Sequence, residues 1–138
     1  MKVFTKSIDV KARAESLLDI TPLASGAVKE SGVSSGIVTI FVPGATGAVS
    51  TIEYEPGLLK DIPRALERIA PSNEDYEHHK TWGDDNGKSH VRATLIGPSL
   101  VVPLKDKQLM LGRWQQVVFM NLDTSDRERT IIFQIIGE

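Results

Sequence analysis

The side chains best suited to chemistry are concentrated in one short stretch, residues 75–90. All three histidines of the chain, His78, His79 and His90, lie there, and Asn86 lies between the second and the third. A neutral imidazole can bind a transition metal or act as a general acid or base near neutral pH. We therefore expect this stretch to form part of any functional site that the protein has.

His78 and His90 suit two kinds of site. They could hold a divalent metal, zinc or magnesium, with Glu53 or Asp85 as an oxygen ligand and water completing the shell. They could instead act as catalytic acid and base, with Asn86 orienting them. If Asn86 caps a helix, the positive helix end disfavours the imidazolium form of His90. The spacing alone says little, so a solvated His78 and a locally bonded His90 stay open as the alternative.

The turn at residues 43–47 is the second candidate, because it is built from small residues. Gly44 and Gly47 would let a phosphate approach backbone amides closely, and Thr46 adds a hydroxyl donor. The lysine of the P-loop motif is missing, and the turn joins two predicted strands instead of leading into a helix. A plain glycine-rich turn is the alternative to a phosphate site.

Arginines could supply the positive charge for the same phosphate. Arg127 is the candidate, and Arg129 shares its face if the segment is already a strand. A guanidinium can bind phosphate oxygens in a bidentate manner. The alternative for these arginines, and for Arg113, is ordinary exposed or interfacial charge. Trp114 leads into an apolar strand, which is more typical of a core or subunit contact than of a site wall.

Composition excludes several classes of function. The 138 residues suit a single domain, residues 1–138, with 41% hydrophobic and 25% charged residues, as in an ordinary soluble globule. The formal charge of −2 gives no overall attraction to nucleic acid or to anionic lipid, and no apolar run is long enough to span a membrane. The absence of cysteine excludes disulfides, thiolate metal sites and cysteine nucleophiles. We expect a cytoplasmic protein with no nucleic-acid or membrane partner.

Strand patterns dominate the framework that must position these residues. Alternating or β-branched runs predict strands over residues 2–10, 36–42, 48–54, 99–104, 115–122 and 130–136, with a short piece near 109–111. The run over 36–42 is almost wholly apolar, which predicts burial on both faces. Turn residues predict hairpin loops at 105–107 and 124–126.

Helices are expected between the strands. Apolar spacing predicts them over residues 22–30, 58–69 and about 87–97, with a long polar connection at 70–85. Thr21, Asp61 and Asn86 are the expected N-terminal caps, Gly32 supplies a left-handed stop, and Pro63 is expected to kink or restart the second helix. The predicted fold class is α+β, with a mainly antiparallel barrel-like sheet and two or three inserted helices.

Four blocks of sequence resemble one known family in their order and spacing. They are Val42 to Ala48 followed by Glu53, Tyr76-Glu77-His78, Asp85 to His90, and Leu111 to Gln115. The ending with Leu122-Asp123 and Arg127-Glu128-Arg129 fits the same family. On these residues the chain resembles the YjbQ family, UPF0047, over almost its whole length.

The resemblance implies a compact α+β fold with a barrel-like sheet, a homotrimer, and a metal or anion site between subunits. It also implies a weak, secondary thiamine-phosphate synthase activity, which joins a pyrimidine pyrophosphate to a thiazole phosphate and releases pyrophosphate. The alternative is a noncatalytic trimer that binds a metal or a small phosphorylated molecule. Many members carry His-Thr-Thr where this chain has Gly44-Ala45-Thr46. Only two of three family histidines are therefore matched, by His78 and His90, which favours an anion over a metal.

Overall fold

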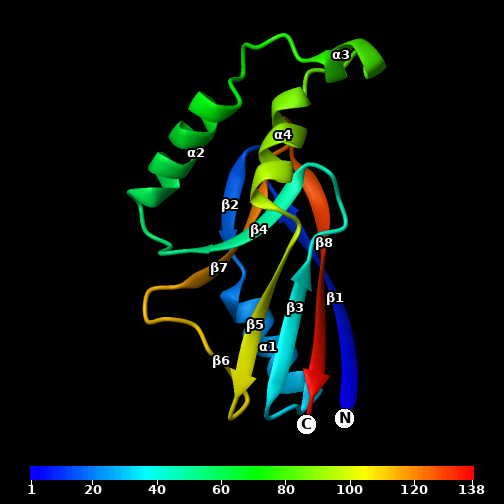
Figure 1. Cartoon of the computed structure of the whole chain (residues 1–138), viewed down its shortest axis with the longest axis vertical. Helices are drawn as coiled ribbons and strands as arrows, with labels where there is room; N and C mark the ends of the chain where they lie inside the picture. The colour runs from blue at the N-terminus through cyan, green and yellow to red at the C-terminus, as the bar shows by residue number, and fades with distance from the viewer.

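The computed structural model describes residues 1–138 and contains two antiparallel sheets and four helices (Figure 1). The strands are β1 (Lys2–Ala12), β2 (Ser16–Asp19), β3 (Gly36–Phe41), β4 (Gly47–Ile52), β5 (Ser99–Lys105), β6 (Gln108–Leu109), β7 (Gln116–Asn121) and β8 (Arg127–Gly137). The helices are α1 (Thr21–Ser31), α2 (Leu58–Ile69), α3 (Glu77–Trp82) and α4 (Gly87–Ile96). The α+β class with antiparallel strands is confirmed, and the helices number four instead of two or three.

The sheets differ in size, and the core lies between them. The order is β1-β8-β3-β5-β6 in the five-stranded sheet and β2-β7-β4 in the three-stranded sheet. Along β8 the buried Ile131, Phe133 and Ile135 alternate with outward residues such as the exposed Gln134, as the two-residue period of a strand requires. α1 lies behind the larger sheet in Figure 1 and belongs to the same apolar core through residues such as Val28.

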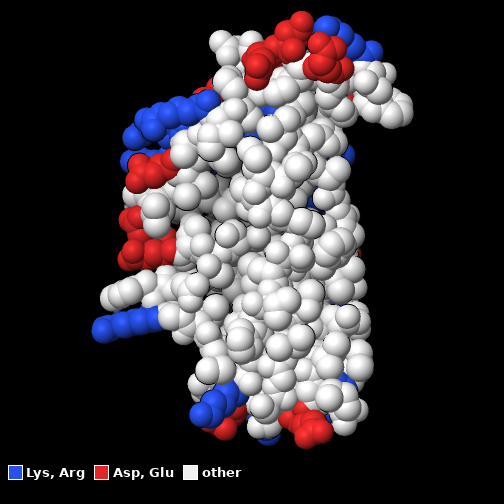
Figure 2. Space-filling view, viewed as in Figure 1, with Lys and Arg blue, Asp and Glu red and all other residues white.

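β3 lies inside the larger sheet, yet only one of its faces is buried. Val38 and Ile40 are fully buried, whereas Ile37 and Phe41 are each 39% exposed on the opposite face. The prediction of burial on both faces is wrong for a single chain, because α1 and the core lie on the inner side only. Figure 2, in the same view, shows that the central part of the outer side carries no charged side chains.

α1 forms where the spacing of apolar residues predicted it, with a different arrangement at its start. The hydroxyl of Thr21 accepts a hydrogen bond from the Val117 amide at 2.8 Å instead of capping the helix. Asp19 accepts a hydrogen bond from the Thr21 amide at 3.0 Å. The helix ends at Gly32 in a left-handed conformation, with φ of 72°, as predicted.

α2 also forms over the predicted residues, but the predicted cap is wrong. The carboxylate of Glu55 accepts hydrogen bonds from the amides of Gly57 and Leu58 at 2.7 and 2.6 Å, so this residue, and not Asp61, satisfies the first amides. α2 runs through Pro63 without a restart. Proline removes only one intrahelical hydrogen bond at that position.

Residues 70–85 do not form one long loop, because α3 lies within them. The helix ends at Gly83, which is left-handed with φ of 68°, and none of its residues is buried. α2, α3 and α4 gather at the end of the molecule opposite to both termini (Figure 1).

Of the two predicted hairpins, one is confirmed and one is wrong. β5 and β6 pair through a tight turn in which Asp106 and Lys107 have positive φ. β7 and β8 do not pair, since β7 lies between β2 and β4 while β8 lies between β1 and β3. The segment 124–126 therefore carries the chain from one sheet to the other.

None of the four helices has both the length and the apolar character that a membrane-spanning helix requires.

Candidate functional site

The start of α4, which carries His90, is fixed by α3. Asn86 occupies the N-cap position as predicted, but its side chain makes no capping bond. Instead, Nε2 of His79 accepts a hydrogen bond from the Gly87 amide at 3.0 Å. A Cβ atom at Gly87 would stand 2.4 Å from Cβ of Tyr76, so a glycine is required for α3 to approach α4 this closely.

The side chain of Asn86 joins His78 to Asp84. Its amide nitrogen lies 3.1 Å from Nε2 of His78 and 3.1 Å from Oδ2 of Asp84. A carboxylate only accepts hydrogen bonds, so Asp84 faces the nitrogen of the amide, and Nε2 of His78 accepts from the same group. Oδ2 of Asp84 also lies 3.3 Å from Nε2 of His78, where it can accept a hydrogen bond once that nitrogen is protonated. This geometry fits the orienting role predicted for Asn86.

The structure brings His78 and His90 together. The centroids of their rings lie 4.3 Å apart, with the ring planes inclined by 48°. Burial lowers the pKa of His90 below its ordinary value, and the charge of His78 lowers it further, against the opposing effect of Asp84 and Asp123. His90 is therefore held as a neutral imidazole near neutral pH, in a form that can accept a proton. The prediction from the positive helix end had the same direction, a lowered pKa of His90, but burial is the leading cause.

His90 lines an open groove of about 320 Å³ together with the small-residue turn. The other lining residues are Gly44, Ala45, Gly47, Ala93, Thr94 and Pro98. The two candidate regions of the sequence, the turn and the histidine stretch, thus meet in space. The groove runs between the turn and α4, and no acidic side chain lines it.

The turn offers backbone donors that the chain does not use. No hydrogen bond within the chain involves the amides of Ala45 or Thr46, whereas the Gly44 amide donates to the Val42 carbonyl at 3.0 Å. The hydroxyl of Thr46 is already committed, because it is buried and donates to Asp123 at 3.1 Å. The hydroxyl of Thr46 is therefore not free for the predicted phosphate, and of the two unused amides only that of Ala45 belongs to a residue that lines the groove.

Asp123 is the buried anion next to the turn. It accepts hydrogen bonds from the Thr124 amide at 2.7 Å and from the Thr46 hydroxyl, and it pairs with Arg127 at 3.2 Å and Arg129 at 3.4 Å. Burial by itself would raise the pKa of Asp123, but these hydrogen bonds and the two guanidinium groups hold it below its usual value. The carboxylate therefore stays ionised and anchors both arginines.

Arg129, rather than Arg127, lies at the turn. Its side chain is only 15% exposed, and a Cβ atom built on Gly44 would stand 3.1 Å from its Nη1. The side chain of Arg127 is 51% exposed and lines a separate groove with Lys11 and Arg13. Both arginines share one face of β8 as predicted, yet only the second is placed beside the candidate phosphate site.

Of the four predicted metal ligands, only His78 and His90 come together within one chain. Glu53 is exposed just beyond β4, and Asp85 lies 3.4 Å from the hydroxyl of Thr124 instead of meeting either imidazole. No group of three or more His, Asp or Glu side chains is arranged to hold a metal ion. The donor set of a single chain therefore does not fit zinc or magnesium.

Sequence reasoning missed the parts that Asp84 and His79 play in the site. Nothing in the local pattern marks His79 as the acceptor for the Gly87 amide, because the contact exists only when α3 folds back against α4. The importance of Asp123 had one signal, its place in the final block of the family resemblance.

These observations define a small α+β protein with a paired-imidazole and glycine-turn site at one end. A family model described as "UPF0047 protein YjbQ-like" matches residues 6–138. A UPF0047 protein of Methanothermobacter thermautotrophicus is 36% identical over all of this chain and 95% of its own length. The chain therefore belongs to the YjbQ-like UPF0047 family, which confirms the resemblance seen in the sequence.

Solved structures show the same fold. A YbjQ-like protein of unknown function from Sulfolobus solfataricus has a TM-score of 0.93 and 35% identity, with 99% of each chain covered. A hypothetical protein from Aeropyrum pernix has a TM-score of 0.91 and 32% identity, covering 98% of this chain and 99% of that one.

Proposed function

We propose that the protein binds a phosphorylated small molecule in the groove between the turn at residues 43–47 and α4. The observation that supports this most is that Ala45, whose backbone amide makes no hydrogen bond within the chain, lines the same groove as His90. Backbone amides in a turn of small residues suit phosphate oxygens. The groove has no acidic lining that would repel an anion.

On such a ligand the histidine pair supports a weak thiamine-phosphate synthase activity, of the kind that the family resemblance implies. In that reaction a thiazole nitrogen forms a bond to the methylene carbon of the pyrimidine substrate. The bond from that carbon to the pyrophosphate oxygen breaks, and pyrophosphate leaves with the bonding electrons. The thiazole nitrogen has no proton to lose, so the role left for the imidazoles is to donate hydrogen bonds to the departing oxygen.

A product assay with both heterocyclic phosphates tests this proposal. We expect product above background from the native chain and a decrease of about tenfold for His90→Gln, the fold-change that corresponds to losing one hydrogen bond of about 1.4 kcal/mol in the transition state. Arg13→Gln serves as a control, because Arg13 lines the separate groove with Arg127. Product at background for the native chain would contradict the synthase proposal.

A noncatalytic anion-binding role is the second candidate. The observation in its favour is that one chain does not assemble a metal-ligand group, while the donors of the turn remain. Binding of inorganic phosphate that raises the melting temperature, with no product in the assay, would select this role. A ligand that prefers the native state must stabilise it.

Copies of the chain associate, in our proposal, as the homotrimer that the family resemblance implies, within the cytoplasm. Support comes from the outer face of the larger sheet, where Val101 is 55% exposed and Phe41 39% exposed in an uncharged area (Figure 2). Val101→Lys should shift the mass measured by light scattering from that of a trimer to that of a monomer. A native chain that is monomeric at high concentration would refute the trimer.

A further inference from the structure

We infer that Arg129 is the cation that holds the phosphate of the ligand, and that the turn takes one phosphate monoester group, the thiazole phosphate of the proposed reaction, and not the pyrophosphate. This inference rests on the proposed function, because it assigns the charge and the ligand class of the same groove. It departs from the sequence prediction, which placed this role on Arg127.

The unused donors of Arg129 are the first step. Only Nη2 of its three nitrogens makes hydrogen bonds, to Thr46, Asn121 and Asp123. Nε is buried without a partner, and Nη1 lies beside Gly44, with no hydrogen bond of its own. The Nε–H bond points along the edge shared with Nη2 and is buried, so Nη1 is the donor that remains for a ligand. A charge-assisted hydrogen bond from a guanidinium to a phosphate oxygen is among the strong ones in proteins.

The position of these donors is the second step. Gly44 lines the groove with His90, and its missing side chain is what leaves Nη1 at the turn. The free amides of Ala45 and Thr46 follow directly along the chain. Ala45 lines the groove and Thr46 does not, so the Ala45 amide and Nη1 of Arg129 are the donors available to one oxyanion at the turn.

The charge balance gives the ligand class. Asp123 offsets one positive charge of the pair formed with Arg127 and Arg129, and Arg127 lines the other groove. No lysine or arginine lines the His90 groove itself, and Nη1 of Arg129 lies beside one of its lining residues, Gly44. A second phosphoryl group would meet no additional cation, so a diphosphate gains nothing over a monophosphate there.

The test is a titration of the folded protein with inorganic phosphate by calorimetry. Arg129→Gln should weaken binding by at least about tenfold, the range for losing a charge-assisted hydrogen bond, while Arg13→Gln, which removes the same charge elsewhere, should leave it unchanged. Unchanged affinity in Arg129→Gln, or a larger loss in Arg127→Gln than in Arg129→Gln, would overturn the inference.

A second variant keeps the test decisive if Arg129→Gln fails to fold. Gly44→Ala places a methyl group 3.1 Å from Nη1, which must shift by a few tenths of an ångström, and covers the face of the turn beside it, whereas Gly26→Ala adds the same methyl where no atom lies within 4 Å. Weaker phosphate binding in Gly44→Ala alone supports the inference. Equal binding in the two alanine variants contradicts it.

Pyrophosphate titrated without added metal tests the ligand class. We expect it to bind no more tightly than phosphate. Tenfold tighter binding of pyrophosphate would refute the monoester assignment. A native chain that binds neither anion would refute the inference together with the proposed anion site, whereas native phosphate binding that ignores Arg129 would refute the inference alone.

Discussion

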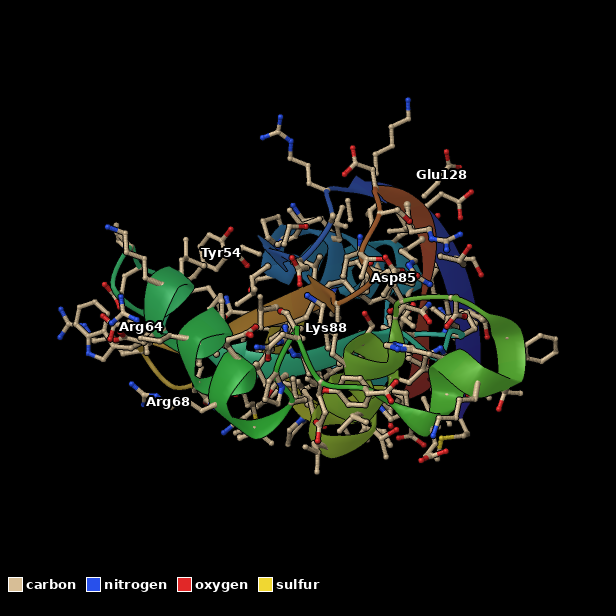
Figure 3. All side chains as sticks on the ribbon, turned by 90° about the horizontal axis from the view of Figure 1, so that it is seen from above. Tyr54, Arg64, Arg68, Asp85, Lys88 and Glu128 are labelled. Carbon is tan, nitrogen blue, oxygen red and sulfur yellow. The ribbon has the colours of Figure 1, made fainter.

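The two sides of α4 are held by the rest of the protein in opposite ways. On one side, Lys88 and Arg92 are 8% and 4% exposed and are paired with carboxylates. Nζ of Lys88 lies 2.5 Å from Glu15, and Arg92 lies 2.8 Å from Glu67. Seen from above, Lys88, which belongs to α4, lies in the interior near α2, while Arg68 of α2 points outward (Figure 3).

On the other side, His90 lies against the ring of His78 and lines the groove together with small residues. His78 belongs to α3, which has no buried residue and touches α4 through the hydrogen bond from Gly87 to His79 and the tilted rings of His78 and His90. The comparison shows that α4 is held on one side by ion pairs of buried cations. On the other side it is held by contacts that water can replace. α4 should therefore keep its place when α3 does not.

Removing the anchored side should have the largest effect. Arg92→Ala deprives the Ala70 carbonyl and Glu67 of their donor, and we expect the free energy of unfolding to fall by about 2–3 kcal/mol. Because Glu67 is half exposed and can be rehydrated, the effect stays at the lower end for a buried charge. Urea unfolding measures it, with Arg64→Ala on the exposed side of α2 as the control. Equal midpoints for the two variants would contradict the comparison.

Removing the cap on the other side should act locally. His79→Leu removes the acceptor for the Gly87 amide, which we expect to cost about 1 kcal/mol, as for other helix caps. Amide exchange at Gly87 and proteolysis within residues 77–82 should speed up, while the global melting temperature changes little. Lys80→Leu adds the same side chain at an exposed position of α3 and is the control. A global loss as large as that of Arg92→Ala would show that the two sides are not distinct.

Most strands and helices of this fold could be predicted from the sequence, because the residue patterns that indicate them are local. The alternation along β8 and the amphipathic spacing of α2 are set by residues that are neighbours in the chain. The burial of the outer face of β3 was predicted wrongly for the same reason. The apolar pattern of residues 36–42 is the same whether the rest of the chain covers one face of the strand or both.

The site was readable only in part, because its decisive contacts join distant segments. The family blocks pointed to His78 and His90, and the structure pairs them. The choice between Arg127 and Arg129 depends on how far along β8 the turn at residues 43–47 lies, which no local pattern encodes. The use of Asn86 as a bridge to His78 instead of a cap likewise depends on α3, which the sequence presented as loop.

Lowering the pH should affect the stability of the two sides of α4 differently. We expect this effect to be the smallest of the three but the most specific. The hydroxyl and amide of Ser72, with Arg92, lower the pKa of Glu67 to about 2, so the ion pair on the anchored side stays charged at pH 5. The pKa of His90 is depressed, so the unfolded chain takes up its proton first as pH falls. The stability that His90 contributes is then fully present above its ordinary pKa of about 6.5 and is lost as pH falls through its lower folded value.

NMR titration of the His90 ring, together with the melting temperature between pH 7 and pH 5, measures this effect. The ring should titrate below the ordinary histidine value, and His90→Gln should flatten the part of the stability profile that belongs to it. The groups that face the ring, His78, Asp84 and Asp123, all contribute to its pKa, so His78→Gln should move it upward by removing a positive neighbour. A ring that titrates at or above the ordinary value would mean that His90 is not buried against His78. The two sides of α4 would then not differ in how they respond to pH.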